Sequence, residues 1–258
     1  MGDAIATDST TRTTDASWDW HWRRQRLPRL PRWFNPNVAF AKKLLRWAVE
    51  SSPKRLFEVG CAPGAWMGFL SRQLNAEVSG CDLSALGVAT TRENLRLLGV
   101  RGRVYEADVF DLAEKIPDRF ELVYSFGVVE HFDDLTSILR AHGDLSEPDG
   151  TVVVTAPNLQ GFSGAIFRRA SPSLMDSHRL VTPTDLRRAA REAGLEPEAA
   201  GYGGPLSAFV WLDRIDSRIR RLVTYAFSLA IGVLSFTASS RLLSGSVYLI
   251  AKRSPHSS

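Results

Sequence analysis

The sequence predicts an α/β fold in which helices cover both faces of a largely parallel sheet. Short apolar runs recur along the chain and end on glycine or an acidic residue, as at 55–60 and 77–82. Stretches with apolar residues at helical spacing separate these runs. The run at 120–125 is nearly continuous in apolar residues, which is typical of a strand buried on both faces. Strands that alternate with helices in this way indicate a parallel sheet.

The expected elements follow in a regular order and have recognisable ends. Ser84 is expected to cap a helix that runs through Leu98. Thr182 and Pro183 mark a helix start, and Gly194 closes that helix. The other expected elements are a helix from Asn35 or Asn37 to about Glu50, helices at 65–74 and 133–145, strands at 104–107 and 151–156, a turn at 147–150 and a last strand at 247–251.

Composition is that of an ordinary globular chain. The 258 residues suffice for one α/β domain with a sizeable core and appendages. Hydrophobic residues make up 44% and charged residues 23%. A net charge of +4 does not by itself favour a nucleic-acid partner. Two cysteines, Cys61 and Cys81, without an export signal indicate reduced thiols and a cytoplasmic protein.

The sequence divides into five parts. Residues 1–16 are rich in small polar residues and are expected to form a disordered tail. Residues 17–50 form an N-terminal arm and helix. The arm carries tryptophans and arginines and is expected to pack on the domain over the cofactor, with RNA binding as the open alternative. Residues 51–204 form the core, 205–243 a hydrophobic helical insert, and 244–258 the last strand and tail.

The stretch Arg55–Asp82 carries the main binding motif. A strand ends in Gly60-Cys61-Ala62-Pro63-Gly64, a helix follows, and the next strand ends on Asp82. Such a unit holds a nucleoside-bearing cofactor at the carboxyl ends of parallel strands, with the acidic residue on the ribose diol. Ala62 stands where a dinucleotide-binding turn has its middle glycine, which weakens an interpretation as a nicotinamide or flavin dinucleotide site.

The form Glu58-x-Gly60-Cys61-x-Pro63-Gly64, with Asp82 eighteen residues after Gly64, resembles motif I of the class I S-adenosylmethionine (SAM) methyltransferases. This resemblance covers about residues 50–205 and 244–253 and implies a Rossmann-like seven-stranded sheet whose last strand is inserted antiparallel. It also implies SAM as the cofactor. The SAM-binding residues implied at this end are Glu58, Gly60, Cys61, Ala62, Gly64, Asp82 and Leu83.

A second motif follows the third expected strand. Glu106-Ala107-Asp108-Val109 resembles the family motif in which an acidic side chain bonds the adenine amino group. The resemblance therefore implies that Asp108 and the main-chain amide of Val109 bind adenine.

A third motif follows the fourth expected strand. The stretch Ser125–Phe132 resembles a signature of the family branch that includes ubiquinone-pathway and natural-product methyltransferases. Phe126 and Gly127 would border the methionine part of SAM. His131 would face the substrate and orient or deprotonate its nucleophile. A structural role for Glu130 and His131, fastening the loop to the sheet, is equally open.

The same motif bears on metal binding. Some ubiquinone-pathway O-methyltransferases bind a divalent metal through Glu-x-x-Glu-His, and here Gly127 occupies the first acidic position. Glu130 and His131 alone make a poor site for a hard cation. We therefore predict no essential metal.

Two later residues are further candidates at the substrate side. His178 precedes the Thr182 helix start, in a loop that covers the substrate in relatives, and is the second catalytic candidate. Asn158, directly after the fifth expected strand, is a candidate for the rim of the site.

Motifs that the sequence lacks exclude several classes of methyl acceptor. The chain lacks the Asp/Asn-Pro-Pro-Tyr/Phe motif of amino-methyltransferases, and Ser125 and Phe126 stand where rRNA 2′-O-methyltransferases need an aspartate. A Pro-Cys pair for cytosine chemistry is also missing. What remains is methyl transfer to a small or lipophilic acceptor, at oxygen in preference to carbon or nitrogen. A non-catalytic SAM-binding or membrane-docked scaffold is the alternative.

The insert at 205–243 is not needed by the sheet. Four arginines precede residues 222–240, which carry no charge but include several serines and threonines. Three interpretations remain open: a helical lid over the substrate, an amphipathic surface that docks on a membrane or partner, and a membrane span. Docking would place a cytoplasmic protein at the inner face of a membrane.

Overall fold

The computed structural model describes most of the expected core and parts of the remaining chain. The described residues are 18–19, 22–23, 25–31, 52–162, 164–165, 168, 175, 177–204 and 240–254. The expected tail at 1–16, the helix expected to end near Glu50 and most of the insert, 205–239, lie outside them. Within these ranges, the helices are all too short or too polar to cross a membrane.

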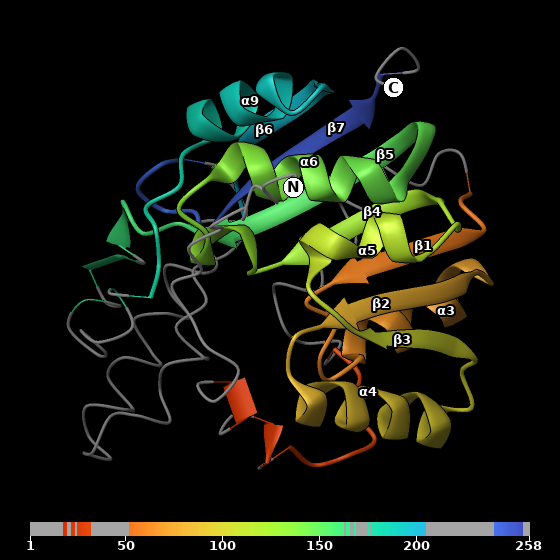
Figure 1. The fold of residues 1–258 in the computed structure, drawn as a ribbon. Coiled ribbons are helices and arrows are strands. Elements are labelled where there is room, and N and C mark those ends of the chain that lie inside the picture. The colour runs from red at the N-terminus through yellow and green to blue at the C-terminus, as the bar shows by residue number, and fades with distance from the viewer. Residues whose placement is uncertain are drawn as a thin grey trace, which may run out of the picture.

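A seven-stranded sheet forms the centre of the core (Figure 1). Its strands are β1 (Arg55–Val59), β2 (Glu77–Asp82), β3 (Gly102–Glu106), β4 (Phe120–Phe126), β5 (Ser146–Pro157), β6 (Leu195–Gly203) and β7 (Ser246–Arg253). They run in the order β3-β2-β1-β4-β5-β7-β6. Neighbours from β3 to β5 are parallel, whereas β7 lies antiparallel between β5 and β6. The predicted seven-stranded sheet with an antiparallel last strand is confirmed.

Helices cover both faces of this sheet. They are α3 (Ala65–Leu74), α4 (Ala85–Leu98), α5 (Val109–Lys115), α6 (Leu135–Leu145) and α9 (Pro183–Glu192), with a short 3₁₀ helix η1 (Val129–His131). In Figure 1, α5 and α6 cross in front of the sheet, and α3 lies behind β2 and β3. Contacts join α5 to α6, α6 to α9, and α3 to α4. The predicted double-sided α/β arrangement is therefore correct.

Successive strand side chains alternate between two apolar clusters. Phe57 packs with Leu112 and Leu139 in the cluster under α5, α6 and α9. Its neighbour Leu56 packs with Met67 and Leu95 in the cluster under α3 and α4. The alternation follows from the two-residue period of a strand, and it explains why the central strands are rich in apolar residues on both faces.

The capping residues expected from the sequence have that role. Ser84 accepts a hydrogen bond from the amide of Gly87 at 2.9 Å and caps α4. Thr182 and Asp185 form a reciprocal capping box at the start of α9. These local bonds satisfy amides that the first helical turn leaves unpaired.

Two elements differ from the expectation. Helix α5 was not predicted; Asp108 caps it by accepting a hydrogen bond from Phe110 N at 3.1 Å. Strand β5 begins at Ser146, because the expected turn at 147–150 lies inside the strand as an irregularity, with Asp149 at φ 62°. Propensity alone does not distinguish a turn that ends a strand from one that bulges within it.

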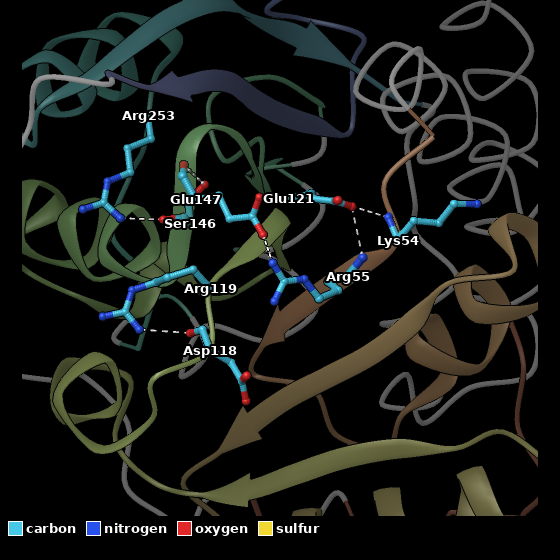
Figure 2. Close-up of polar contacts among 8 residues, drawn as sticks. All are labelled: Lys54, Arg55, Asp118, Arg119, Glu121, Ser146, Glu147 and Arg253. Atoms are coloured by element: carbon cyan, nitrogen blue, oxygen red, sulfur yellow. Dashed lines mark hydrogen bonds and ion pairs between the residues drawn. The ribbon is translucent and has the colours of Figure 1, made fainter.

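Hydrogen bonds and an ion pair of charged residues link strands at the amino edge of the sheet (Figure 2). Glu121 at the start of β4 accepts hydrogen bonds from the amides of Lys54 and Arg55, just before and at the start of β1. Arg55 pairs with Glu147, and Arg253 at the end of β7 donates to the carbonyl of Ser146. These contacts lie at the edge opposite the carboxyl ends of the parallel strands.

A buried histidine lies between α6 and β4. His142 has no exposed surface. Its Nδ1–H donates to the carbonyl of Ile138 at 2.8 Å, and its Nε2 accepts from the hydroxyl of Ser125 at 3.0 Å. Burial lowers the pKa of His142 from 6.5 to about 4.

This histidine predicts acid-sensitive stability. Between pH 6.5 and about 4 the unfolded chain protonates His142 and the folded chain does not, so folding loses stability as the pH falls. Across this pH range the free energy of unfolding falls by about 3 kcal/mol on account of His142. We expect the difference in free energy of unfolding between wild type and His142→Gln, measured by urea denaturation, to decrease by about this amount from about pH 7.5 to about pH 4.5. If the free energies of unfolding of the two proteins changed equally with pH, a buried neutral His142 would be contradicted.

Candidate functional site

A pocket opens at the carboxyl edge of the sheet, where β1, β2, β3 and β4 end. Its volume is about 800 Å³ when the solvent-filled space at its mouth is included. Most of the residues that the sequence assigns to SAM line it: Gly60, Ala62, Asp82, Leu83, Asp108, Val109, Phe126 and Gly127. The ends of the parallel strands thus bring together three motifs that are far apart in the sequence.

The first wall of the pocket is the glycine turn after β1. Gly60 has φ +67°, and a Cβ atom there would lie 2.6 Å from Cγ2 of Val128. Gly64 has φ +76°, and its Cβ would lie 2.7 Å from Cγ2 of Thr91 in α4. Both positions therefore need glycine, for conformation and for space.

Asp82 holds this turn against the start of α4. Its Oδ2 accepts a hydrogen bond from Ala62 N at 3.2 Å, and its Oδ1 accepts from Ser84 N at 3.0 Å. The two amides orient the carboxylate at the pocket wall, at the end of β2, where the motif predicts a ribose contact.

Three residues assigned to the cofactor do not line the pocket. Glu58 is 4% exposed and accepts a hydrogen bond from the hydroxyl of Tyr124 at 3.1 Å; burial raises the pKa of its carboxyl well above the ordinary value. Cys61 is buried against Gly80, and burial raises the pKa of its thiol. Gly64 packs on α4. All three support the turn, and their direct contact with SAM stays a prediction.

Asp108 and Gly127 each combine a pocket position with a structural role. Asp108 lines the pocket while capping α5. Gly127 has φ +75°, and its amide donates to the carbonyl of Thr155 at 2.9 Å. Its conformation turns the chain from the end of β4 into η1, which carries Glu130 and His131.

Glu130, His131 and His178 lie together, and His131 places this cluster beside the pocket. His131 lines the pocket and is 5% exposed, and its ring centroid lies 4.5 Å from that of His178. The carboxylate Oε1 of Glu130 lies 4.0 Å from Nε2 of His131. The loop that carries His178 is bound to η1, because the amide of Arg179 donates to the carbonyl of Glu130 at 2.7 Å. The structure therefore brings both predicted catalytic histidines together.

Hydrogen bonding defines the tautomer of His131. Its Nδ1 lies 2.8 Å from the carbonyl oxygen of Ser177, which can only accept, so Nδ1 carries the proton. Burial, and next the charge of His178, lower the pKa of His131 to about 4. Burial raises the pKa of Glu130 to about 8. Both shifts favour neutral groups, so Glu130 and His131 form no ion pair at neutral pH.

The N-terminal arm closes another side of the pocket. Trp18 and Trp22 line it, their rings stack with centroids 6.1 Å apart, and Trp18 packs edge-on against His131 at 5.2 Å. Asp19 accepts a hydrogen bond from the hydroxyl of Ser84 at 2.7 Å. Sequence reasoning expected the tryptophans of the arm to pack on the domain, and of those that the structure describes, Trp18 and Trp22 line the pocket. Their four-residue spacing, which puts them on one side of a helical turn, was the available signal.

Asn158 is not part of the rim, contrary to the expectation. It is fully buried, and its Nδ2 donates to the carbonyls of Arg241 and Ser244, both at 2.8 Å. Its Oδ1 accepts from Gln160 N at 3.1 Å. An amide side chain can satisfy several backbone groups at once, so Asn158 joins the end of β5 to the turn before β7.

Known proteins resemble this chain over much of its length. A family model described as a methyltransferase domain matches residues 20–200. A ubiquinone biosynthesis O-methyltransferase of Neisseria meningitidis serogroup C (strain 053442) is 32% identical over 152 residues, 55% of this chain and 64% of the relative. A protein of the same name from Dechloromonas aromatica (strain RCB) is 29% identical over 185 residues, 65% of this chain and 79% of the relative. The match thus spans less than two thirds of the first relative.

A solved structure shares the fold. The crystal structure of a SAM dependent methyltransferase from Archaeoglobus fulgidus matches with a TM-score of 0.57 at 18% identity, covering 84% of this chain and 94% of that chain. The family model covers most of the core, and the core has the seven-stranded sheet that is expected of this family. The chain belongs to the class I SAM-dependent methyltransferase family, whose cofactor is SAM.

Proposed function

We propose that the chain transfers the methyl group of SAM to a hydroxyl oxygen of a small, largely apolar acceptor. The observation that carries the proposal is one pocket that is lined both by residues of the SAM motifs and by His131. The relatives described above are named O-methyltransferases, which supports oxygen as the methylated atom.

In this proposal each motif binds one part of SAM. Asp82 would bind the ribose diol, and Asp108 with the amide of Val109 would bind adenine. Phe126 and Gly127 would border the methionine part. This order directs the methyl group toward the end of the pocket that carries His131.

Aromatic side chains form part of the pocket lining. Trp18, Phe126 and Phe132 line the pocket together with Val128 and His131. Such a lining favours a flat or apolar acceptor, with few polar groups to bind it, and this agrees with the lipophilic acceptor expected from the sequence.

His131 acts on the acceptor hydroxyl, with His178 as the second candidate. Because Nδ1 of His131 donates to Ser177, its Nε2 is the atom that accepts a hydrogen bond or proton. The oxygen attacks the methyl carbon, the carbon–sulfur bond breaks with its electrons remaining on sulfur, and the hydroxyl proton passes to Nε2 of His131 or to water. Displacement at a sulfonium needs mainly alignment, so His131 serves as an orienting group first and a base second.

Membrane contact through 205–243 and a cytoplasmic location remain predictions, since residues 205–239 lie outside the described ranges. That the protein does not bind nucleic acid is also a prediction. The alternative of a non-catalytic scaffold predicts cofactor binding without turnover.

Cofactor binding tests the first half of the proposal. Replacing Asp82 by Asn removes a charged hydrogen-bond acceptor and should weaken S-adenosylhomocysteine binding by about tenfold to a hundredfold. Calorimetric titration of wild type, Asp82→Asn and the control Asp118→Asn at the far edge of the sheet measures this. NADH should give no heat. Equal affinity in Asp82→Asn would exclude the assigned ribose contact.

Turnover tests the second half. In His131→Asn the amide nitrogen can still donate to Ser177, but the Nε2 atom is gone, so turnover should fall by about a hundredfold or more. The assay follows S-adenosylhomocysteine release with a panel of apolar phenols and isoprenoid alcohols. S-adenosylhomocysteine affinity should stay as in wild type. Undiminished turnover in His131→Asn would transfer the role to His178, tested in parallel as His178→Ala.

The arm gives a separate kinetic prediction. Asp19→Ala removes the bond between the arm and Ser84 but keeps the α4 cap, so S-adenosylhomocysteine should dissociate about threefold to tenfold faster with little loss of stability. Ser84→Ala removes both and should also lower stability by about 1 kcal/mol. Stopped-flow tryptophan fluorescence and urea denaturation measure the two effects. Dissociation at the wild-type rate in both variants would show that the arm does not retain the cofactor.

A further inference from the structure

The cluster of Glu130, His131 and His178 has the composition of a metal site. Each residue offers one ligand atom, and these atoms all lie within 4.8 Å of one another. Metal–ligand bonds of about 2.0–2.2 Å place ligand atoms about 3 to 4 Å apart. Side-chain shifts of about 1 Å would therefore suffice to bring the three ligands around one ion.

The carboxylate of Glu130 gives an independent sign of a missing partner. Glu130 is 2% exposed, and its Oε2 has no hydrogen-bond partner among the described residues. A buried polar atom without a partner costs free energy, and native proteins rarely retain one without a reason. A cation in the space shared with the two imidazoles would satisfy it.

Hydrogen bonds to the backbone and to Ser177 orient both histidines of the cluster. Nδ1 of His131 donates to the carbonyl of Ser177 at 2.8 Å, which orients the ring and leaves Nε2 toward Glu130. The hydroxyl of Ser177 lies 3.0 Å from Nδ1 of His178. Histidines that bind metals are oriented in this manner by a bond at their other nitrogen.

We propose that Glu130, His131 and His178 bind a divalent cation of intermediate softness, such as Mn²⁺, Fe²⁺ or Zn²⁺. Two imidazoles and one carboxylate favour such ions over Mg²⁺ and Ca²⁺, which prefer oxygen ligands. The expectation of no essential metal counted only Glu130 and His131. His178, from a loop more than forty residues later, replaces the acidic ligand that is missing at Gly127.

The role of the ion rests on the proposed function. The site lies beside the acceptor end of the pocket, because His131 belongs to both. When bound, the ion would act as a Lewis acid on the acceptor oxygen and favour its deprotonated form. Glu130 and the two histidines would then hold the ion and orient the acceptor through it, and the hydroxyl proton would pass to solvent water instead of to His131.

Direct metal binding tests the proposal without reference to turnover. Chelator-treated wild type is titrated with MnCl₂, ZnCl₂ and MgCl₂ in a calorimeter, and bound Mn²⁺ is counted by electron paramagnetic resonance. We expect about one Mn²⁺ or Zn²⁺ per chain and binding of Mg²⁺ at least about tenfold weaker. Glu130→Gln and His178→Ala should each weaken Mn²⁺ binding by at least about tenfold.

Matched controls make these results decisive. His142→Gln removes a histidine outside the cluster and should bind Mn²⁺ as wild type does. Circular dichroism and S-adenosylhomocysteine titration verify that each variant is folded; His178 is only partly buried, so His178→Ala serves if Glu130→Gln unfolds. No Mn²⁺ or Zn²⁺ binding to wild type would overturn the proposal. Equal binding by wild type and His178→Ala would show an adventitious ion only and would overturn it too.

The result is separable from the proposed function. Loss of turnover on chelation, restored by Mn²⁺, supports the role of the ion in methyl transfer. Metal binding with full turnover after chelation overturns that role and leaves His131 to act directly. Metal binding without S-adenosylhomocysteine binding would instead overturn the proposed methyl transfer while the metal site stands.

Discussion

The carboxylate of Asp82 joins the parts of the cofactor site. It accepts hydrogen bonds from the amide of Ala62 in the glycine turn and from the amide of Ser84 at the start of α4. Ser84 in turn caps α4 through Gly87 and donates to Asp19 of the N-terminal arm. A charged acceptor with several lone pairs can orient several backbone groups at once, so one side chain connects turn, helix and arm around the pocket.

Close packing behind the pocket depends on the same turn. Gly60 adopts a left-handed conformation, and Val128 fills the space that a Cβ atom would occupy. Val128 belongs to the segment after β4 that continues into η1 and His131. The glycine turn and the segment that leads to His131 therefore touch directly. A larger residue at position 60 would displace both, so these two motifs are packed as one unit.

The cluster of Glu130, His131 and His178 shows how a loop can bring a side chain to a distant motif. The carbonyl of Ser177 accepts a hydrogen bond from the His131 ring, and the amide of Arg179 donates to the carbonyl of Glu130. His178 lies between these two residues and reaches the ring of His131 and the carboxyl group of Glu130. These hydrogen bonds fix the position of the loop. The contacts of the His178 side chain therefore need not supply the free energy that orders the loop. A titratable group is thereby placed in a partly buried site at low conformational cost.

Local patterns in the sequence determined the strand–helix order, the caps at Ser84 and Thr182, and the pocket positions of Gly60, Asp82 and Asp108, because each follows from short-range backbone chemistry. Only the tertiary structure decided that Glu58 lies behind the turn, that Asn158 fastens β5 to the turn before β7, and that Glu130, His131 and His178 meet. These relations join residues far apart in the chain, and no local propensity encodes them.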